Sequence, residues 1–179
     1  ETPGIEQSGM YGSILNNLGT AFMYQEDNQK ALEGYHRALE DTSPESNPLL
    51  TAQLLTHIGG IHQLEKNFPE ALVFYTKALH IMEENGIAAD QAVVLANMGD
   101  IYREQGEYLK AEERFEKSIA IKNRLRETAA GRDRIDYLAS EIKTYHRLVW
   151  TRVLKGDASG ALETAETSQA RYLSEQIGL

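Results

Sequence analysis

The sequence predicts an all-α protein, an α-solenoid of about four antiparallel helix pairs. Three observations predict this fold. A large apolar residue followed by glycine recurs every 40 residues, at Leu18-Gly19, Ile58-Gly59 and Met98-Gly99. Each glycine is followed 12 residues later by alanine and, after a further 4, by an aromatic residue. The apolar residues between these positions keep a helical period. Such self-similarity is typical of helical units that bury their apolar faces only by stacking on one another.

The recurring small residues have a mechanical reason. The alanines are Ala31, Ala71 and Ala111, the aromatics are Tyr35, Tyr75 and Phe115, and a small residue follows three positions later at Ala38, Ala78 and Ser118. We expect each glycine to lie where the first helix of a pair touches the second, because a larger side chain there would push the helix axes apart. The aromatic residues are expected to fill the space toward the next pair.

The first pair is expected over about residues 12–45, after an N-terminal extension at residues 1–10. Its first helix carries an apolar stripe at Ile14, Leu15, Leu18, Ala21 and Phe22, spaced as on one helix face. A polar break at residues 25–28 ends this helix, and a second apolar stripe follows at Ala31, Leu32, Tyr35, Ala38 and Leu39. The pattern predicts two helices joined by a short turn.

The second pair is expected over residues 48–86 and the third over residues 90–126. Asn47 followed by Pro48 is typical of an N-cap with proline at the first helical position. Pro69 is placed to begin the second helix of this pair, and Gly86 lies where a helix C-terminus favours glycine. The third pair is expected to turn at Gly106.

The fourth pair, over about residues 134–178, is degenerate. Ala161 takes the alanine position and Ser168 the small-residue position, but Val149 stands where glycine is expected. Gly99 and Val149 are 50 residues apart rather than 40, so roughly ten extra residues lie around residues 127–134. They are expected to lengthen the flanking helices or to form a loop. The four repeats together predict a single solenoid domain over residues 11–179.

The composition excludes several classes of function. The chain has no cysteine, which excludes disulfides, thiolate metal sites and a cysteine nucleophile, and fits a reducing compartment. We therefore expect a cytoplasmic location. No apolar run approaches the roughly 18 residues of a membrane span, and the first residues do not form a signal peptide. A start at Glu1 and an end without a polar capping helix suggest a fragment of a larger protein.

Catalytic and metal-binding motifs are absent from the sequence. His57 and His62 are five residues apart and so lie on diverging faces of a helix, and no phosphate-binding loop or nucleophile elbow occurs. His62 takes an aromatic position and is expected to be a packing residue. The sequence predicts a protein that is not an enzyme and that binds no metal or cofactor.

Charge is distributed unevenly along the chain. Residues 1–116 carry 7 Lys/Arg and 19 Asp/Glu, whereas residues 117–155 carry 10 and 4. The basic segment is either a solvated helix face or a site for an acidic partner near Arg124, Arg126, Arg132 and Arg134. The overall net charge of −9 argues against nucleic acid as a partner.

The repeat residues resemble the tetratricopeptide repeat (TPR) pattern of Leu-Gly-x2-Tyr, Ala-x3-Phe and Ala. The first and third copies match closely, and the second departs only at His62. The resemblance implies a right-handed superhelix whose inner groove is lined by the first helix of each pair. It further implies that the residue before each Leu-Gly position faces this groove, namely Asn17, His57, Asn97 and, by a weaker alignment, Arg147.

The neighbourhoods of Asn17 and Asn97 resemble the longer-period TPR arrays of kinesin light chains, spindle-orientation scaffolds and bacterial signalling proteins. In those families such asparagines hold the backbone of an extended peptide, since a carboxamide can donate and accept hydrogen bonds together. The expected groove residues are Asn16, Asn17, Thr20, Thr56, His57, Gln63, Asn97, Asp100, Arg103, His146, Arg147 and Trp150. Two alternatives stay open: the two asparagines bond only their own helix or water, and Trp150 packs within the last pair.

These observations predict a protein-interaction scaffold that binds a protein or peptide, with no nucleic-acid or membrane partner, as part of a larger signalling protein. Self-association through the uncapped ends of the solenoid is a further expectation. Residues 161–173 also resemble the last TPR before a CHAT domain, the caspase-like module of bacterial TPR–CHAT proteins. That resemblance implies an alternative, in which the chain is the substrate-recognition part of an enzyme whose catalytic domain lies elsewhere.

Overall fold

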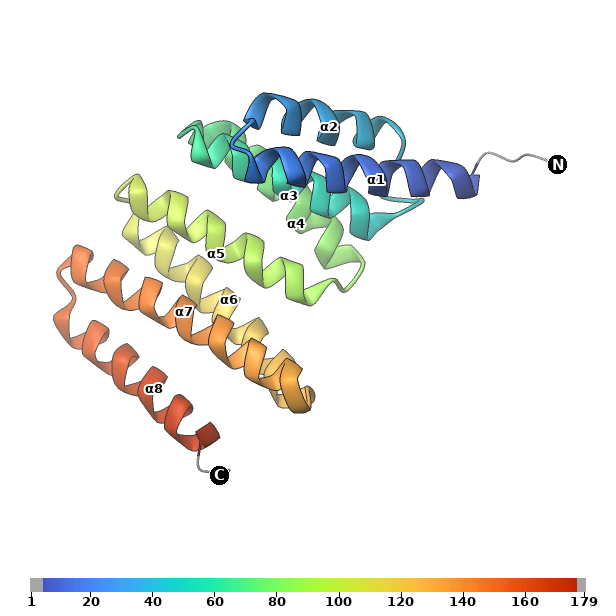
Figure 1. Ribbon diagram of the computed structural model, residues 1–179. Coiled ribbons are helices and arrows are strands. Elements are labelled where there is room, and N and C mark those ends of the chain that lie inside the picture. Colours follow the sequence, from blue (N-terminus) through green and yellow to red (C-terminus); the bar gives the residue numbers. More distant parts are fainter. Residues whose placement is uncertain (1–4, 177–179) are drawn as a thin grey trace. The chain divides into compact units, whose positions relative to one another are not determined.

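The computed structural model describes residues 5–176, and the side chains of residues 10–175. Within this range the chain forms eight helices and no strand (Figure 1). The helices are α1 Ile5–Tyr24, α2 Asn28–Glu40, α3 Pro48–Leu64, α4 Phe68–Glu84, α5 Ala88–Glu104, α6 Tyr108–Thr128, α7 Gly131–Lys155 and α8 Ala158–Gln176. Each odd-numbered helix packs against the helix that follows it. The predicted all-α fold of four helix pairs is confirmed.

The chain divides into two compact units, Glu1–Ile87 and Ala88–Leu179, each containing two helix pairs. The division falls between the second and third predicted repeats, and the single domain predicted over residues 11–179 stays a prediction. One predicted boundary is wrong. Helix α1 begins at Ile5, so residues 5–10 belong to the first helix rather than to an extension. Residues 1–4 and 177–179 lie outside the described range.

The helix ends predicted at Asn47 and Gly86 are present in the structure. The Asn47 side chain accepts a hydrogen bond from the Leu50 backbone N–H at 3.1 Å, which caps α3. Asn67 holds the same place before α4 but makes no capping bond. Gly86 has a φ of 68° directly after α4, and the Ile87 N–H donates to the carbonyl of Met82 at 2.9 Å. This left-handed C-terminal geometry is the one that favours glycine.

The repeated glycines lie at the contact between the two helices of a pair, as predicted, but they also lie against the aromatic ring of the same pair, which the sequence pattern did not predict. A Cβ added to Gly19 would lie 2.6 Å from the Tyr35 ring, and one added to Gly99 would lie 2.7 Å from the Phe115 ring. Both rings are fully buried. In each of these pairs the second helix therefore places its ring directly on the glycine of the first helix. The fourth pair exchanges the sizes, because Val149 stands at the glycine position and Ala165 at the ring position.

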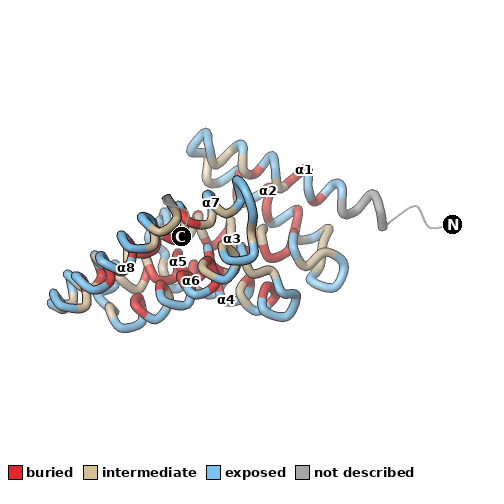
Figure 2. The backbone as a smooth tube through the Cα atoms, turned by 90° about the horizontal axis from the view of Figure 1, so that it is seen from below, coloured by how far each residue is buried: buried red, intermediate tan, exposed pale blue. Residues whose placement is uncertain are grey.

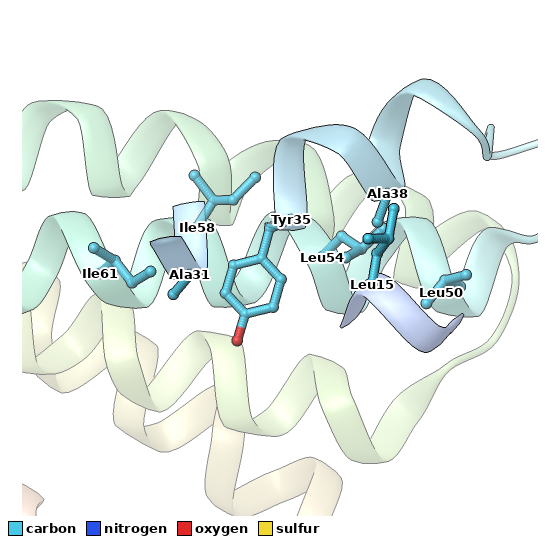
Figure 3. Close-up of a cluster of buried hydrophobic side chains, with 8 residues drawn as sticks. All are labelled: Leu15, Ala31, Tyr35, Ala38, Leu50, Leu54, Ile58 and Ile61. Carbon is cyan, nitrogen blue, oxygen red and sulfur yellow. The ribbon is translucent and has the colours of Figure 1, made fainter. Parts of the chain in front are cut away.

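The core of the first unit joins α1, α2 and α3. Its buried members are Leu15, Ala31, Tyr35, Ala38, Leu50, Leu54, Ile58 and Ile61 (Figure 3). The Tyr35 ring lies among the aliphatic side chains, and its hydroxyl points out of the cluster (Figure 3). The apolar stripe predicted for α1 is only partly buried, because Leu15 packs inside while Ile14, Leu18 and Ala21 are exposed.

The extra residues near 127–134 lengthen the helices rather than form a long loop. Only Ala129 and Ala130 separate α6 from α7. The lengthened ends are joined by ion pairs around Glu141, whose side chain is fully buried. Arg126 Nε lies 3.1 Å from Glu141 Oε2, and Arg171 Nη1 lies 3.0 Å from Glu141 Oε1.

The basic segment is only partly a solvated face, because several of its arginines form ion pairs within the second unit. Arg126 and Arg134 each pair with Glu175, and Arg152 pairs with Glu112 at 2.8 Å. Arg124 and Arg132 are exposed. The sequence could not show this because the partners lie up to 49 residues away along the chain.

Candidate functional site

The predicted groove residues all belong to the first helices of the pairs. Asn16, Asn17 and Thr20 lie on α1, and Thr56, His57 and Gln63 lie on α3, in the first unit. Asn97, Asp100 and Arg103 lie on α5, and His146, Arg147 and Trp150 lie on α7, in the second unit. The two sets are described separately below.

In the first unit a polar network joins α1, α2 and α3. The Asn16 Oδ1 atom lies 3.0 Å from His57 Nδ1, so the imidazole donates to the carboxamide oxygen. Thr20 Oγ1 donates to the Asn16 carbonyl at 2.9 Å and lies 3.2 Å from the Tyr35 hydroxyl. The Tyr35 and His57 rings are 5.0 Å apart between centroids. These contacts set the position of α3 against the first pair.

Three other predicted residues of this unit differ in their availability. Thr56 donates to the carbonyl of Ala52 at 2.8 Å, and Gln63 accepts from the Tyr75 hydroxyl at 2.8 Å. Both side chains are thus engaged within the unit. Asn17 is exposed, and its carboxamide makes no hydrogen bond to the described part of the chain.

In the second unit Asp100 lies between two arginines. Arg103 Nη2, on the same helix, is 2.8 Å from Asp100 Oδ1, and Arg147 Nη1, on α7, is 3.1 Å from Asp100 Oδ2. Burial raises the pKa of the Asp100 carboxyl, and the two guanidinium groups oppose this effect. The ion pair with Arg147 ties α7 to α5.

The other three predicted residues of the second unit differ in their exposure. Asn97 is half-buried, and its carboxamide makes no hydrogen bond within residues 10–175. Trp150 is 57% exposed, so the structure does not support the alternative in which it packs inside the last pair. His146 lines a cavity between α7 and α8.

Sequence reasoning missed two features of these sites. The Tyr35 hydroxyl was treated only as part of a packing residue, although it completes the network around Thr20. Lys122 on α6 is buried and donates to Thr144 Oγ1 at 2.7 Å and to the Ser140 carbonyl at 3.2 Å. Burial lowers the pKa of Lys122 from 10.5 to about 8. The sequence does not indicate this burial, because Lys122 lies in a helix that is rich in other charged residues.

No group of three or more His, Cys, Asp or Glu side chains is placed to hold a metal ion in the described part of the chain. None of the helices, as far as they are described, is long and apolar enough to cross a membrane.

Paired helices with glycine-on-ring packing define an α-helical repeat protein. The family model for the tetratricopeptide repeat matches residues 11–84 and 50–124, which together cover most of the chain. This chain belongs to the tetratricopeptide repeat family. The search of curated proteins returns no match.

Solved structures show the same fold. BtubC (BKLC) from P. vanneervenii superimposes with a TM-score of 0.79 at 20% identity, over 94% of this chain and 65% of that chain. The apo form of RapI gives 0.79 at 18% identity, over 94% of this chain and 44% of that chain. A P. anserina protein with nearly identical TPR-like repeats gives 0.70 at 15% identity, over 94% and 77%. The chain thus spans about two thirds of BtubC and under half of RapI.

Proposed function

We propose that this chain binds an extended peptide segment of a partner protein along the first helices of its pairs, with Asn17 and Asn97 holding the peptide backbone. The observation that carries the proposal is the state of these two carboxamides. They occupy the same repeat position, 80 residues apart, and neither makes a hydrogen bond within the described part of the chain. A peptide C=O and N–H can satisfy one carboxamide together.

Asn16, the residue before Asn17, differs from the two proposed ligand-binding asparagines. Its carboxamide oxygen is already engaged by His57 at 3.0 Å, so it positions α3 rather than a ligand. We assign Thr20, Thr56 and Gln63 the same supporting role. In the second unit we assign specificity to exposed Trp150 on α7 and to the Arg147–Asp100 pair, which joins α7 to the helix that carries Asn97. Aromatic and arginine side chains are the residue types that most often anchor protein interfaces.

The test selects a ligand first and then removes the carboxamides. Random peptides displayed on phage are selected on the chain, and the best peptide is labelled for fluorescence anisotropy. Each hydrogen bond contributes about 1 kcal/mol, so loss of one bond or more at each asparagine is expected to weaken binding by the double variant Asn17→Ala/Asn97→Ala at least roughly 30-fold, which is about 2 kcal/mol. Asn67→Ala is the control, because this asparagine is exposed, makes no capping bond and lies outside the first helices. Equal affinity of wild type and the double variant contradicts the proposal.

The resemblance to TPR arrays that precede CHAT domains stays a prediction. Residues 161–173 form part of α8, with Ala161 buried against the pair and Leu173 exposed. These features are those of any second helix of a pair, and they favour no enzymatic context.

A further inference from the structure

The short connection between α4 and α5 contains an asparagine followed by glycine. It consists of Asn85, Gly86 and Ile87, and it also links the two compact units along the chain, since the first unit ends at Ile87. Asn85 is the only asparagine in the sequence that precedes a glycine. Asn85 and Gly86 are both exposed, like most residues of the turns between helices, which are pale blue in Figure 2. Water therefore reaches this dipeptide directly.

The peptide group between Asn85 and Gly86 is not held by the fold. Within the described residues, neither the Asn85 carbonyl nor the Gly86 N–H makes a hydrogen bond. Gly106 and Gly156 follow α5 and α7 in the same left-handed conformation, but each donates from its N–H to the carbonyl three residues earlier at 3.0 Å. Of these three glycines, Gly86 alone thus has a backbone nitrogen that is free to react.

The Asn85 side chain is held by a single contact. Its Nδ2 donates to the Ile81 carbonyl at 2.9 Å. The Asn85 ψ angle is 5°, and it must rotate before the Gly86 nitrogen can reach Cγ. This rotation breaks no hydrogen bond of the peptide group itself. Glycine also leaves the nitrogen unhindered, because it has no Cβ.

We propose that Asn85 is a site of spontaneous deamidation, with the Gly86 nitrogen as the nucleophile and water as the second reactant. The nitrogen loses its proton to water and bonds to Asn85 Cγ, the Cγ–Nδ2 bond breaks, and ammonia leaves, which forms a succinimide ring. Water then opens the ring. Cleavage between Cγ and the Gly86 nitrogen gives aspartate, and cleavage between the main-chain carbonyl carbon and that nitrogen gives isoaspartate. In sum, asparagine and water give an acid and ammonia.

Both products weaken the C-terminal end of α4. They lose the Nδ2 donor to the Ile81 carbonyl, and they add a negative charge after Glu83 and Glu84, at the helix end where the helix dipole disfavours it. Isoaspartate also adds a methylene group to the main chain before Gly86. The reaction needs no enzyme, so the modified fraction grows with the age of the protein. The proposal is independent of peptide binding by the first helices.

The test incubates the full chain at physiological pH and temperature and locates each conversion by tandem mass spectrometry of tryptic peptides. Two asparagines are internal controls. Asn97 lies in the same tryptic peptide, residues 78–103, but precedes Met98. Asn67 is exposed and makes no capping bond, but precedes Phe68. Conversion is expected at Asn85 alone, as two products that separate by chromatography, and the Asn85→Gln variant is expected to stay unmodified at this position.

A parallel sample in guanidinium chloride measures the rate in the unfolded chain, and the folded chain is expected to convert at a rate of the same order. Two results overturn the proposal: a folded chain that stays unmodified at Asn85 while the unfolded chain converts, or conversion of Asn67 as fast as that of Asn85. The Asn85→Asp variant reproduces one product and is expected to melt below the wild type. An equal Tm would contradict the inferred weakening of α4.

Discussion

Replacing Gly59 by alanine tests whether ring packing dictates the glycine that recurs every 40 residues. A Cβ at this position would lie 2.8 Å and 2.9 Å from two carbons of the Tyr75 ring and 3.3 Å from the carbonyl oxygen of Ala71. Carbon atoms in good contact are about 3.5–4.0 Å apart. The Tyr75 ring is 1% exposed and cannot move into solvent. The helices α3 and α4 must therefore separate or the ring must leave its position.

The adjacent Gly60 is a matched control on the same helix. A Cβ there meets only the Tyr75 hydroxyl, at 3.7 Å, which is an ordinary contact. Both substitutions gain about 1 kcal/mol from the higher helix propensity of alanine. Overpacking costs Gly59→Ala about 1–3 kcal/mol in addition. The expected result is that Gly60→Ala stabilises the protein and that Gly59→Ala is less stable than Gly60→Ala by about 1–3 kcal/mol.

Thermal unfolding followed by circular dichroism measures the difference. For a chain of this size each kcal/mol shifts Tm by about 2–4 °C, so the two variants are expected to melt at clearly separate temperatures. Gly19→Ala and Gly99→Ala should behave like Gly59→Ala, since their added Cβ atoms would lie 2.6 Å and 2.7 Å from a ring. A Gly59→Ala protein that melts at or above the Tm of Gly60→Ala would refute the packing argument.

Three further substitutions, two of them paired with a control variant, test one helix cap and two buried charges. Lys122→Met is expected to raise the free energy of unfolding by up to about 3 kcal/mol at neutral pH, because the lysine pKa of about 8 lies below its ordinary 10.5. Between pH 8 and pH 10.5 the Lys122 side chain is protonated in the unfolded chain and neutral in the folded chain. The free energy of unfolding of the wild type therefore rises over this range toward that of the variant, and urea titration measures this rise. Asn47→Ala should cost about 1 kcal/mol by the same assay, and Asn67→Ala distinctly less, since only Asn47 makes a capping bond. Arg126→Met should cost about 3 kcal/mol by leaving a buried carboxylate short of one partner, whereas exposed Arg124→Met should change stability by under about 0.5 kcal/mol. Equal effects of the two arginine variants would contradict the buried-pair argument.

The candidate site shows where prediction from sequence succeeds and where it stops. The repeat placed Asn16 and Asn17 side by side on a first helix, which the structure confirms. It could not distinguish them, because the distinction depends on His57, which lies 41 residues from Asn16 along the chain. His146 was assigned to the groove on register alone. Its side chain lines the α7–α8 cavity, and the groove assignment stays a prediction.

By itself, the sequence determined the features that depend on short-range chemistry and on the repeat. These are the helix pairs, the caps at Asn47 and Gly86, and the glycines at the contact between the two helices of a pair. Each of these features follows from a local backbone requirement or from the space available within one helix pair. The sequence repeats these requirements at a fixed spacing. The tertiary structure alone decided which charges are paired and which apolar faces are covered. Glu141 and Lys122 are buried, and Ile14 and Leu18 are exposed, because burial depends on neighbours distant in sequence, and a helix shows the same pattern whether or not its next neighbour is present.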